Sequence, residues 1–307
     1  MTDFKPEGWR MHSDENRRAC RSLLALQEAA EQGRILEARA DLCTTEHDMI
    51  VDLGFCQGLI PRAEGAIGMD DGSTRDIALI SRVNKPVCFL VERISRDSAG
   101  EPLPILSRRK AQLKCKEEYL SQLLPGDVVD ARVTHMENFG CFVDIGCGIP
   151  SLIPIDSISV SRIFHPSDRF RCGQDIKAVV RSIDEHGRIT LTHRELLGTW
   201  EENSALFSVG ETVSGIVRSV EPYGIFVELT PNLAGLAEPR EGVHPGQLAS
   251  VYIKSLLPEK MKVKLIIVDA FDAPHEPETL RYFQLGGHMD QWLYSPSCSS
   301  RTIVSEF

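Results

Sequence analysis

Two stretches of the chain place a pair of aromatic residues around a glycine. They read Phe139-Gly140-Cys141-Phe142 and Tyr223-Gly224-Ile225-Phe226, and they start 84 residues apart (223 − 139). Rings exposed on a sheet can stack on the unpaired bases of single-stranded nucleic acid. The alternative is that the rings simply fill a core. The repeat supplies enough other apolar positions for a core, so we favour the stacking platform.

Such a platform needs strands that present both rings on one face. Side chains alternate along a strand, so aromatics three residues apart should face opposite ways. The intervening glycine is a natural place for a β-bulge, which would turn both rings to the same face. The apolar residues that follow would then point inward, and they are Val143, Ile145, Val227 and Leu229.

The aromatic pairs belong to a longer repeat. A Gly-acid-x-Val start precedes each pair, at Gly126 and again at Gly210, and a short apolar strand follows it. A repeat of this length indicates tandem copies of one small domain, although the 307 residues alone would suggest about two domains. The predicted segments are an N-terminal helical segment (1–32, with a helix over 13–32), a degenerate first copy (33–108), a helical linker (109–123), a second copy (124–194), a second helical linker (195–207), a third copy (208–272) and a C-terminal extension (273–307) that packs back onto the third copy.

Composition limits the classes of function. The net charge of −10 argues against an avid, non-specific binder of duplex nucleic acid, but not against binding of single strands. The chain has no apolar run long enough to cross a bilayer and no secretory signal at its start, and its nine cysteines lie at scattered spacings. We therefore expect a cytoplasmic protein with reduced thiols and no membrane partner.

With its later strands included, the chain resembles the S1 RNA-binding domain, a five-stranded OB-fold barrel. Those strands read Val179-Val180-Arg181-Ser182-Ile183-Asp184 and Arg188-Ile189-Thr190-Leu191-Thr192. The resemblance covers about 33–272, and it is strong in the second and third copies and weak in the first. As a whole, the chain looks like a short multi-domain bacterial homologue of ribosomal protein S1. This implies a mainly β fold of three tandem OB barrels joined by short helices, with an N-terminal helix and a short C-terminal α/β extension.

The resemblance also implies which residues contact RNA in the second copy. Family members use two aromatics of the second strand, a His after the third, and an Asp and an Arg near the turn between the last two strands. The matching residues here are Phe139, Phe142, Asp184 and Arg188, while Pro154 stands at the His position. The second copy is therefore expected to be the best RNA site.

The other copies depart from this pattern. The third copy keeps Tyr223 and Phe226, has Glu238 at the His position, aligns Asp269 with the family Asp and puts Ala273 at the Arg position. In the first copy, His47 and Ile50 replace the aromatics, so a docking or structural role is favoured there.

Two groups of cations allow two interpretations each. Lys260, Lys262 and Lys264 would share one face of a strand, where they could follow phosphates or protect a sheet edge. The cations that open the linker helix at 108–116 oppose the helix dipole. They form either a solvated face or the flank of an RNA groove.

No motif for catalysis is present, so we expect a protein that is not an enzyme, with no cofactor and no metal. Cys141, Cys147 and Cys172 are interpreted as thiols rather than metal ligands. The expected partners are single-stranded RNA or mRNA and the small ribosomal subunit, with the chain a monomer acting in translation or mRNA handling. The main alternative is a protein-docking scaffold with little RNA contact, and a more distant one is an RNA-processing enzyme or its accessory subunit.

Overall fold

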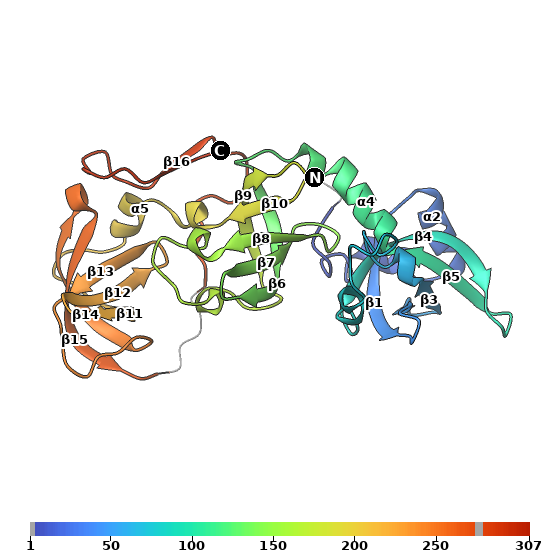
Figure 1. Ribbon diagram of the computed structural model, residues 1–307, viewed down its shortest axis with the longest axis horizontal. Coiled ribbons are helices and arrows are strands. Elements are labelled where there is room, and N and C mark those ends of the chain that lie inside the picture. Colours follow the sequence, from blue (N-terminus) through green and yellow to red (C-terminus); the bar gives the residue numbers. More distant parts are fainter. Residues whose placement is uncertain (1–3, 274–278) are drawn as a thin grey trace. The chain divides into compact units, whose positions relative to one another are not determined.

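A computed structural model describes residues 4–273 and 279–307 of the chain. Its main elements are three closed barrels of five strands each, which confirms the predicted mainly β fold (Figure 1). Barrel 1 contains β1 (Leu36–Cys43), β2 (Met49–Asp52), β3 (Gln57–Ile60), β4 (Pro86–Arg96) and β5 (Pro102–Ser107). Barrel 2 contains β6 (Val128–Glu137), β7 (Gly140–Asp144), β8 (Pro150–Pro154), β9 (Asp175–Ile183) and β10 (Ile189–Thr192). Barrel 3 contains β11 (Thr212–Glu221), β12 (Gly224–Thr230), β13 (Leu233–Ala237), β14 (Leu248–Leu257) and β15 (Lys262–Phe271).

The three barrels share one topology. In each barrel the first three strands are neighbours in sequence order, and the third then pairs in parallel with the fifth. The fifth strand pairs with the fourth, which returns to the first and closes the barrel. This common pairing makes positions in different barrels directly comparable.

The helices are short. The α-helices are α1 (Asp14–Ala19), α2 (Leu23–Glu31), α3 (Ile77–Ile80), α4 (Arg108–Glu118) and α5 (Trp200–Ser204). The 3-10 turns are η1 (Arg62–Glu64), η2 (Leu120–Gln122), η3 (Ile155–Ser157), η4 (Pro166–Asp168), η5 (Arg194–Leu197) and η6 (Pro258–Lys260). Among the described helices, none is long and apolar enough to pass through a bilayer.

The single helix predicted over 13–32 is wrong, because two helices occupy this range. The hydroxyl of Ser13 accepts the N–H of Asn16, and the hydroxyl of Ser22 accepts the N–H of Ala25. Each serine therefore caps the start of its own helix. The second cap starts a new helix where one continuous helix was expected.

The chain divides into two compact units. Unit 1 contains residues 1–123 and the loop 144–150, and unit 2 contains residues 124–143 and 151–307. The core of unit 1 is formed by α2 and the inward faces of barrel 1, with Leu26, Met49, Ile60, Phe89 and Leu106 fully buried.

The cations that open α4 are paired within unit 1, a role that was not predicted, whereas Lys116 farther along the helix is exposed, as expected of a solvated face. The ion pairs are Arg108 with Glu7, Arg109 with Glu64 and Lys110 with Glu92, each with an N–O distance of 2.7 Å. Burial alone would raise the pKa of Glu7, but the charge and hydrogen bonds of Arg108 outweigh it and lower that pKa to about 2. These three cations therefore form ion pairs with carboxylates of the same unit.

Unit 2 joins barrels 2 and 3 through a buried ion network. The guanidinium of Arg218 binds Glu228 through two nitrogens, at 2.9 and 3.0 Å, and Arg169 binds the same carboxylate. Arg169 lies between the strands of barrel 2, whereas Arg218 and Glu228 belong to barrel 3. Near this network, the side chain of the buried Asn232 accepts the N–H of Val160. Its amide group also donates to the carbonyls of Arg194 and Gly198, at the two ends of η5. These hydrogen bonds join barrels 2 and 3 a second time.

The C-terminal segment packs on both barrels of unit 2, not on barrel 3 alone as predicted (Figure 1). His288 forms a bridge with Asp127 of barrel 2, and the hydroxyl of Tyr294 donates to the carbonyl of Asn232 in barrel 3 at 2.6 Å. Residues 279–307 form a two-stranded sheet, β16 (Gln291–Leu293) and β17 (Val304–Glu306), with no helix in this described part, so the predicted α/β character is not seen there. The start of the predicted extension includes 274–278, which lie outside the described residues.

Candidate nucleic-acid interface

The aromatic pair of barrel 2 forms an exposed ring cluster. Phe139 is 57% exposed, and Phe142 is half-buried beside it. Their ring centroids lie 6.0 Å apart with the planes at 89°, so the edge of one ring meets the face of the other. This is a favourable geometry for an aromatic pair, and it leaves ring surface open to solvent.

The rings share a face for a reason other than the predicted bulge at the glycine. Phe139 lies in the two-residue turn between β6 and β7, and only Phe142 belongs to the strand. A Cβ added to Gly140 would lie 2.5 Å from the carbonyl oxygen of Ile153 on β8. The glycine is therefore needed because the neighbouring backbone comes so close.

Barrel 3 repeats this arrangement closely. Tyr223 is 68% exposed in the turn before β12, and its ring centroid lies 6.2 Å from that of Phe226 with the planes at 86°. The register shift of this hairpin lies in β11, between Val217 and Ser219, and not at Gly224. The predicted inward residues are buried in both copies, and they are Val143, Ile145, Val227 and Leu229.

Asp184 and Arg188 lie together in the turn between β9 and β10. The carboxylate of Asp184 accepts the backbone N–H groups of Arg188 and His186 at 2.8 and 2.9 Å, and the Arg188 Nε lies 3.3 Å from it. The N–H of Arg188, then that of His186 and the Arg188 charge, hold the pKa of Asp184 below its usual range. Asp184 thus shapes the turn, and Arg188 stays exposed.

The sheet order brings this turn near the aromatic pair. The strands β7, β8 and β10 are consecutive neighbours in the barrel, and Leu152 of β8 pairs with Thr190 of β10. Arg188 precedes Thr190 by two residues. The cation therefore lies near the start of β10, two strands from the strand that carries Phe142.

The lysines of barrel 3 lie on the outside of a central strand. Lys262 and Lys264 are exposed at alternate positions of β15, whereas Lys260 lies in the 3-10 turn before it. Because β15 pairs with both β13 and β14, the interpretation as a protected sheet edge is wrong. Across the strands, Phe226 pairs with Leu236 and Leu236 pairs with Lys264, so one outer row joins a ring to a cation.

The structure also corrects the alignment of the third copy. Lys264 pairs with β13 as Thr190 pairs with β8, so Lys262 is the counterpart of Arg188. Asp269 lies near the other end of β15, and Ala273 lies beyond it, so neither occupies the turn between the last two strands. The error arose because β15 is ten residues long, while the matching strand β10 has four.

Barrel 1 lacks the platform, as predicted. Ile50 pairs with Leu59 in the register in which Phe226 pairs with Leu236. His47 lies in the preceding turn with its Nδ1 3.9 Å from the carboxylate of Asp76. No ring pair is therefore formed at this place in barrel 1.

A third ring of barrel 2 was missed by the sequence argument. The imidazole of His135 lies 6.4 Å from the ring of Phe142, centroid to centroid, with the planes only 22° apart. A two-residue turn pairs Glu221 with Gly224 in barrel 3, and the same turn in barrel 2 puts His135 opposite Phe142. The length of the turn was the signal that could have identified this residue.

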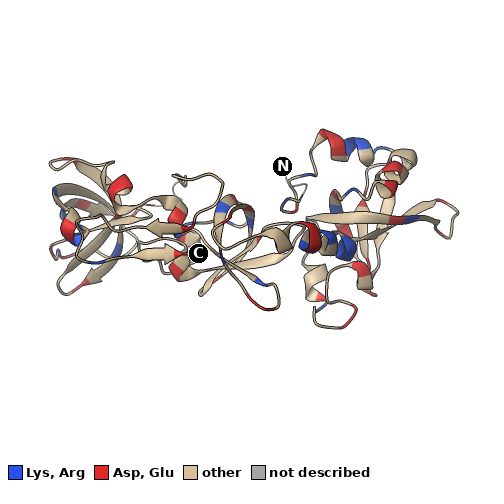
Figure 2. Ribbon diagram, turned by 90° about the horizontal axis from the view of Figure 1, so that it is seen from above, with Lys and Arg blue, Asp and Glu red and all other residues tan. Residues whose placement is uncertain are grey.

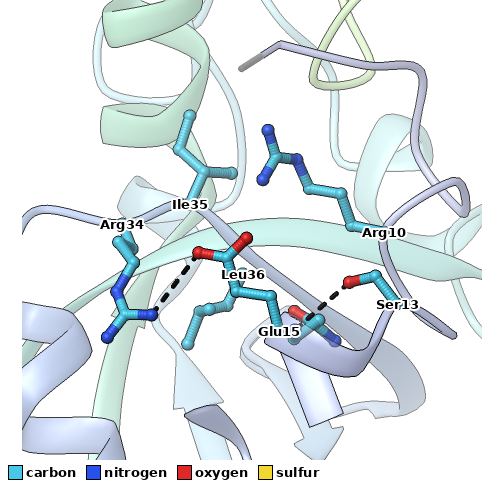
Figure 3. A pocket seen from close by; sticks show the side chains of 7 residues that line it. Arg10, Ser13, Glu15, Arg34, Ile35 and Leu36 are labelled. Carbon is cyan, nitrogen blue, oxygen red and sulfur yellow. Dashed lines mark hydrogen bonds and ion pairs between the residues drawn. The ribbon is translucent and has the colours of Figure 1, made fainter. Parts of the chain in front are cut away.

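The rest of the surface has no comparable candidate for a binding site among the described residues. Acidic and basic residues are interspersed over the elements of the chain (Figure 2). A small hollow in unit 1 has a volume of about 20 Å³, and in it Arg34 and Glu15 point toward each other with a 3.5 Å N–O distance (Figure 3). This is room for about one water molecule. Within residues 4–273 and 279–307, no three His, Cys, Asp or Glu side chains are grouped so that they could hold a metal ion.

Comparison with protein families supports the resemblance. Residues 123–194 match the model of the S1 RNA binding domain. The small ribosomal subunit protein bS1 homolog of Bacillus subtilis is 34% identical over 194 residues, which cover 60% of this chain and 48% of that protein. The bS1 protein of Staphylococcus aureus (strain COL) is 28% identical over 260 residues, covering 79% and 63%. The chain thus spans about half the length of the curated relatives it matches, and its resemblance to S1 proteins is confirmed.

Two solved structures give more distant matches. A multidomain protein with nucleic acid binding domains from Streptococcus pneumoniae is 14% identical, with a TM-score of 0.26, over 77% of this chain and 74% of that one. The protein GSP13 from Bacillus subtilis is 23% identical, with a TM-score of 0.23, over 24% and 57%.

Proposed function

We propose that this relative of the ribosomal S1 proteins binds single-stranded RNA through barrels 2 and 3. The observation that carries the proposal is the repeated aromatic pair, exposed on the same turn and strand of both barrels with nearly the same geometry. Two rings grouped at the surface in the same way on two barrels provide equivalent platforms on which bases can stack.

The charged residues fit the same role. Arg188 in barrel 2 and Lys262 in barrel 3 hold equivalent places near their aromatic pairs, and Lys264 continues the row in barrel 3. These cations can neutralise phosphates locally in a chain whose net charge is −10. Stacking supplies affinity that does not depend on base identity. Binding should therefore be modest, sensitive to salt and tolerant of sequence.

We propose that the biological setting is translation or mRNA handling in the cytoplasm, with the small ribosomal subunit as a partner and the chain acting as a monomer without a cofactor. Barrel 1, where Ile50 replaces the ring, is the part suited to docking. The main alternative, a protein scaffold with little RNA contact, rests on this same barrel and on the acidic charge balance.

The test is fluorescence anisotropy of a labelled, unstructured 12-nucleotide RNA titrated with the full chain at low and moderate salt. Replacing Phe139 and Phe142 together by alanine should weaken binding by about tenfold or more, since each stacked base contributes about 1–3 kcal/mol. Leu124→Ala, at an exposed apolar residue outside both aromatic pairs, is the matched control and should leave binding unchanged. Equal affinity of the double variant and the wild type, or no binding at tens of micromolar protein, would contradict the proposal.

A further inference from the structure

His135 extends the ring cluster of barrel 2 on the strand next to Phe142. Its side chain is 63% exposed, so the ring is available to a ligand. The Nε2 atom lies 2.6 Å from the carboxylate of Glu137, which holds the imidazole in place. The 22° angle to Phe142 means that the two rings present nearly parallel faces, whereas Phe139 meets Phe142 edge to face.

Barrel 3 provides an internal comparison, because a serine stands where barrel 2 has its third ring. The repeat period of 84 residues puts Ser219 at the place of His135, and Ser219 pairs directly with Phe226 across the strands. A serine hydroxyl has no ring face to offer a base. At this strand position beside the aromatic pair, barrel 2 therefore has a ring and barrel 3 has a hydroxyl.

We propose that His135 is a base-stacking residue that gives barrel 2 one more nucleotide position than barrel 3. This inference rests on the proposed RNA binding and deepens it. The parallel faces of His135 and Phe142 let successive bases of one strand lie on neighbouring rings, as on the stacking platforms of single-strand binders. The ligand is single-stranded RNA, and the residue at this position contributes to the difference in affinity between the two barrels.

The structure favours this role over a purely structural one. The imidazole is mostly exposed, and its polar contact is with the neighbouring exposed residue Glu137, so neither side chain supports the core. The hydrogen bond fixes the ring, which reduces the conformational entropy that RNA binding would otherwise cost. Loss of the ring should therefore leave the fold intact.

The experiment exchanges the two residues. His135→Ser is placed in a background of Tyr223→Ala and Phe226→Ala, so that binding reports on barrel 2 alone. Ser219→His is placed in the Phe139→Ala, Phe142→Ala background, so that binding reports on barrel 3. Anisotropy with unstructured RNAs of 3 to 12 nucleotides then gives affinity and the length at which it stops increasing.

We expect His135→Ser to weaken binding by about fivefold or more and to shorten the saturating length by one nucleotide, and Ser219→His to do the reverse. His135→Phe, which keeps a ring without the nitrogen atoms, should bind like the parent. Far-UV circular dichroism and thermal melts check that each variant is folded.

Unchanged affinity and length for folded His135→Ser, while Phe139→Ala with Phe142→Ala still abolishes binding to barrel 2, would overturn this inference and leave RNA binding standing. Loss of affinity in His135→Phe equal to that in His135→Ser would also overturn stacking. Absence of binding in every protein, the wild type included, would remove both this inference and the proposed function.

Discussion

At the scale of single residues, the glycine between the aromatics limits what the turn can carry. The Gly140 Cα faces the carbonyl of Ile153 on the neighbouring strand, so no side chain fits between the two backbones. The same contact exists at Gly224, where an added Cβ would lie 2.6 Å from the carbonyl oxygen of Ala237. Each glycine lets β7 or β12 pack closely and so fixes where the adjacent ring points.

Gly140→Ala should therefore destabilise the chain by about 1–3 kcal/mol, because the new methyl group forces the two strands apart. It should also weaken RNA binding, since Phe139 moves with the turn. Urea unfolding and RNA titration of the same protein measure both effects. Gly286→Ala, where nothing lies within 4 Å of the added Cβ, is the matched control, and a similar stability for both variants would contradict the explanation.

Sequence alone identified the rings, their exposure and the inward residues, because the repeat fixes equivalent positions. It did not identify the reason for the glycine, since the closeness of Ile153 depends on the register in which β8 packs beside β7. His135 was missed for the same reason, because it reaches Phe142 only through the register of the hairpin.

At the scale of elements, the acidic residue at one position of the repeat acts as a structural link. Asp144 accepts N–H groups of Glu7, Gly146 and Gly148 in unit 1. Glu228, at the matching place of barrel 3, joins β12 to β11 and to the segment that carries Arg169. The same position of the repeat therefore binds backbone N–H groups in one copy and buried arginines in the other.

Replacing Glu228 by glutamine should be strongly destabilising, by about 3–5 kcal/mol, because it removes the carboxylate that two buried guanidinium groups share and leaves Asp168, 3.7 Å from Arg218, to offset both charges. Arg169 and Arg218 are both buried, so solvent does little to offset the lost charge. Denaturant unfolding measures the loss. Glu241→Gln, in an exposed loop, removes the same charge without the junction, and an equal effect of the two changes would rule out the network as the cause.

Element boundaries show what the sequence could and could not predict. The linker helix was expected and is present as α4, whereas the N-terminal helix is divided at Ser22, a cap that looks like any other serine in the sequence. The long β15 was also not foreseen, and this misplaced the counterpart of Arg188 by a whole strand. Pairing partners decide such lengths, and a single sequence does not contain them.

At the scale of the whole molecule, a buried histidine links barrel 2 to the C-terminal segment. The Nδ1 of His193 donates to the carbonyl of Ile158 at 2.9 Å, since a carbonyl oxygen only accepts. Its Nε2 therefore accepts from the hydroxyl of Tyr282 at 3.2 Å, and that oxygen accepts the N–H of Lys177. Burial lowers the pKa of His193 to about 4, so the imidazole is neutral in the fold.

Because the pKa of His193 is lower in the folded state than in the unfolded state, the free energy of unfolding is highest above about pH 6.5. It falls as the pH drops toward 4, because the unfolded chain then binds a proton that the folded one does not. The full difference is about 3 kcal/mol, from about 1.4 kcal/mol for each unit of pKa. Unfolding in urea at pH 7.5, 6, 5 and 4 measures it. His193→Gln should remove this dependence of the unfolding free energy on pH between 6.5 and 4. His186→Gln, at an exposed histidine, should leave it unchanged. An unchanged profile in His193→Gln would contradict this account.

The C-terminal segment also has a consequence for how the chain is made. His288 contacts Asp127 across 161 residues, and Tyr294 reaches Asn232 across 62. Synthesis delivers the strands of barrel 2 long before these partners leave the ribosome. Until then, His193 lacks the hydroxyl of Tyr282, and the surface that Met289 and Trp292 later cover stays open. The strands of barrels 2 and 3 are therefore all synthesised before the residues that cover them, and these barrels gain their cover only once residues 282–294 have been made.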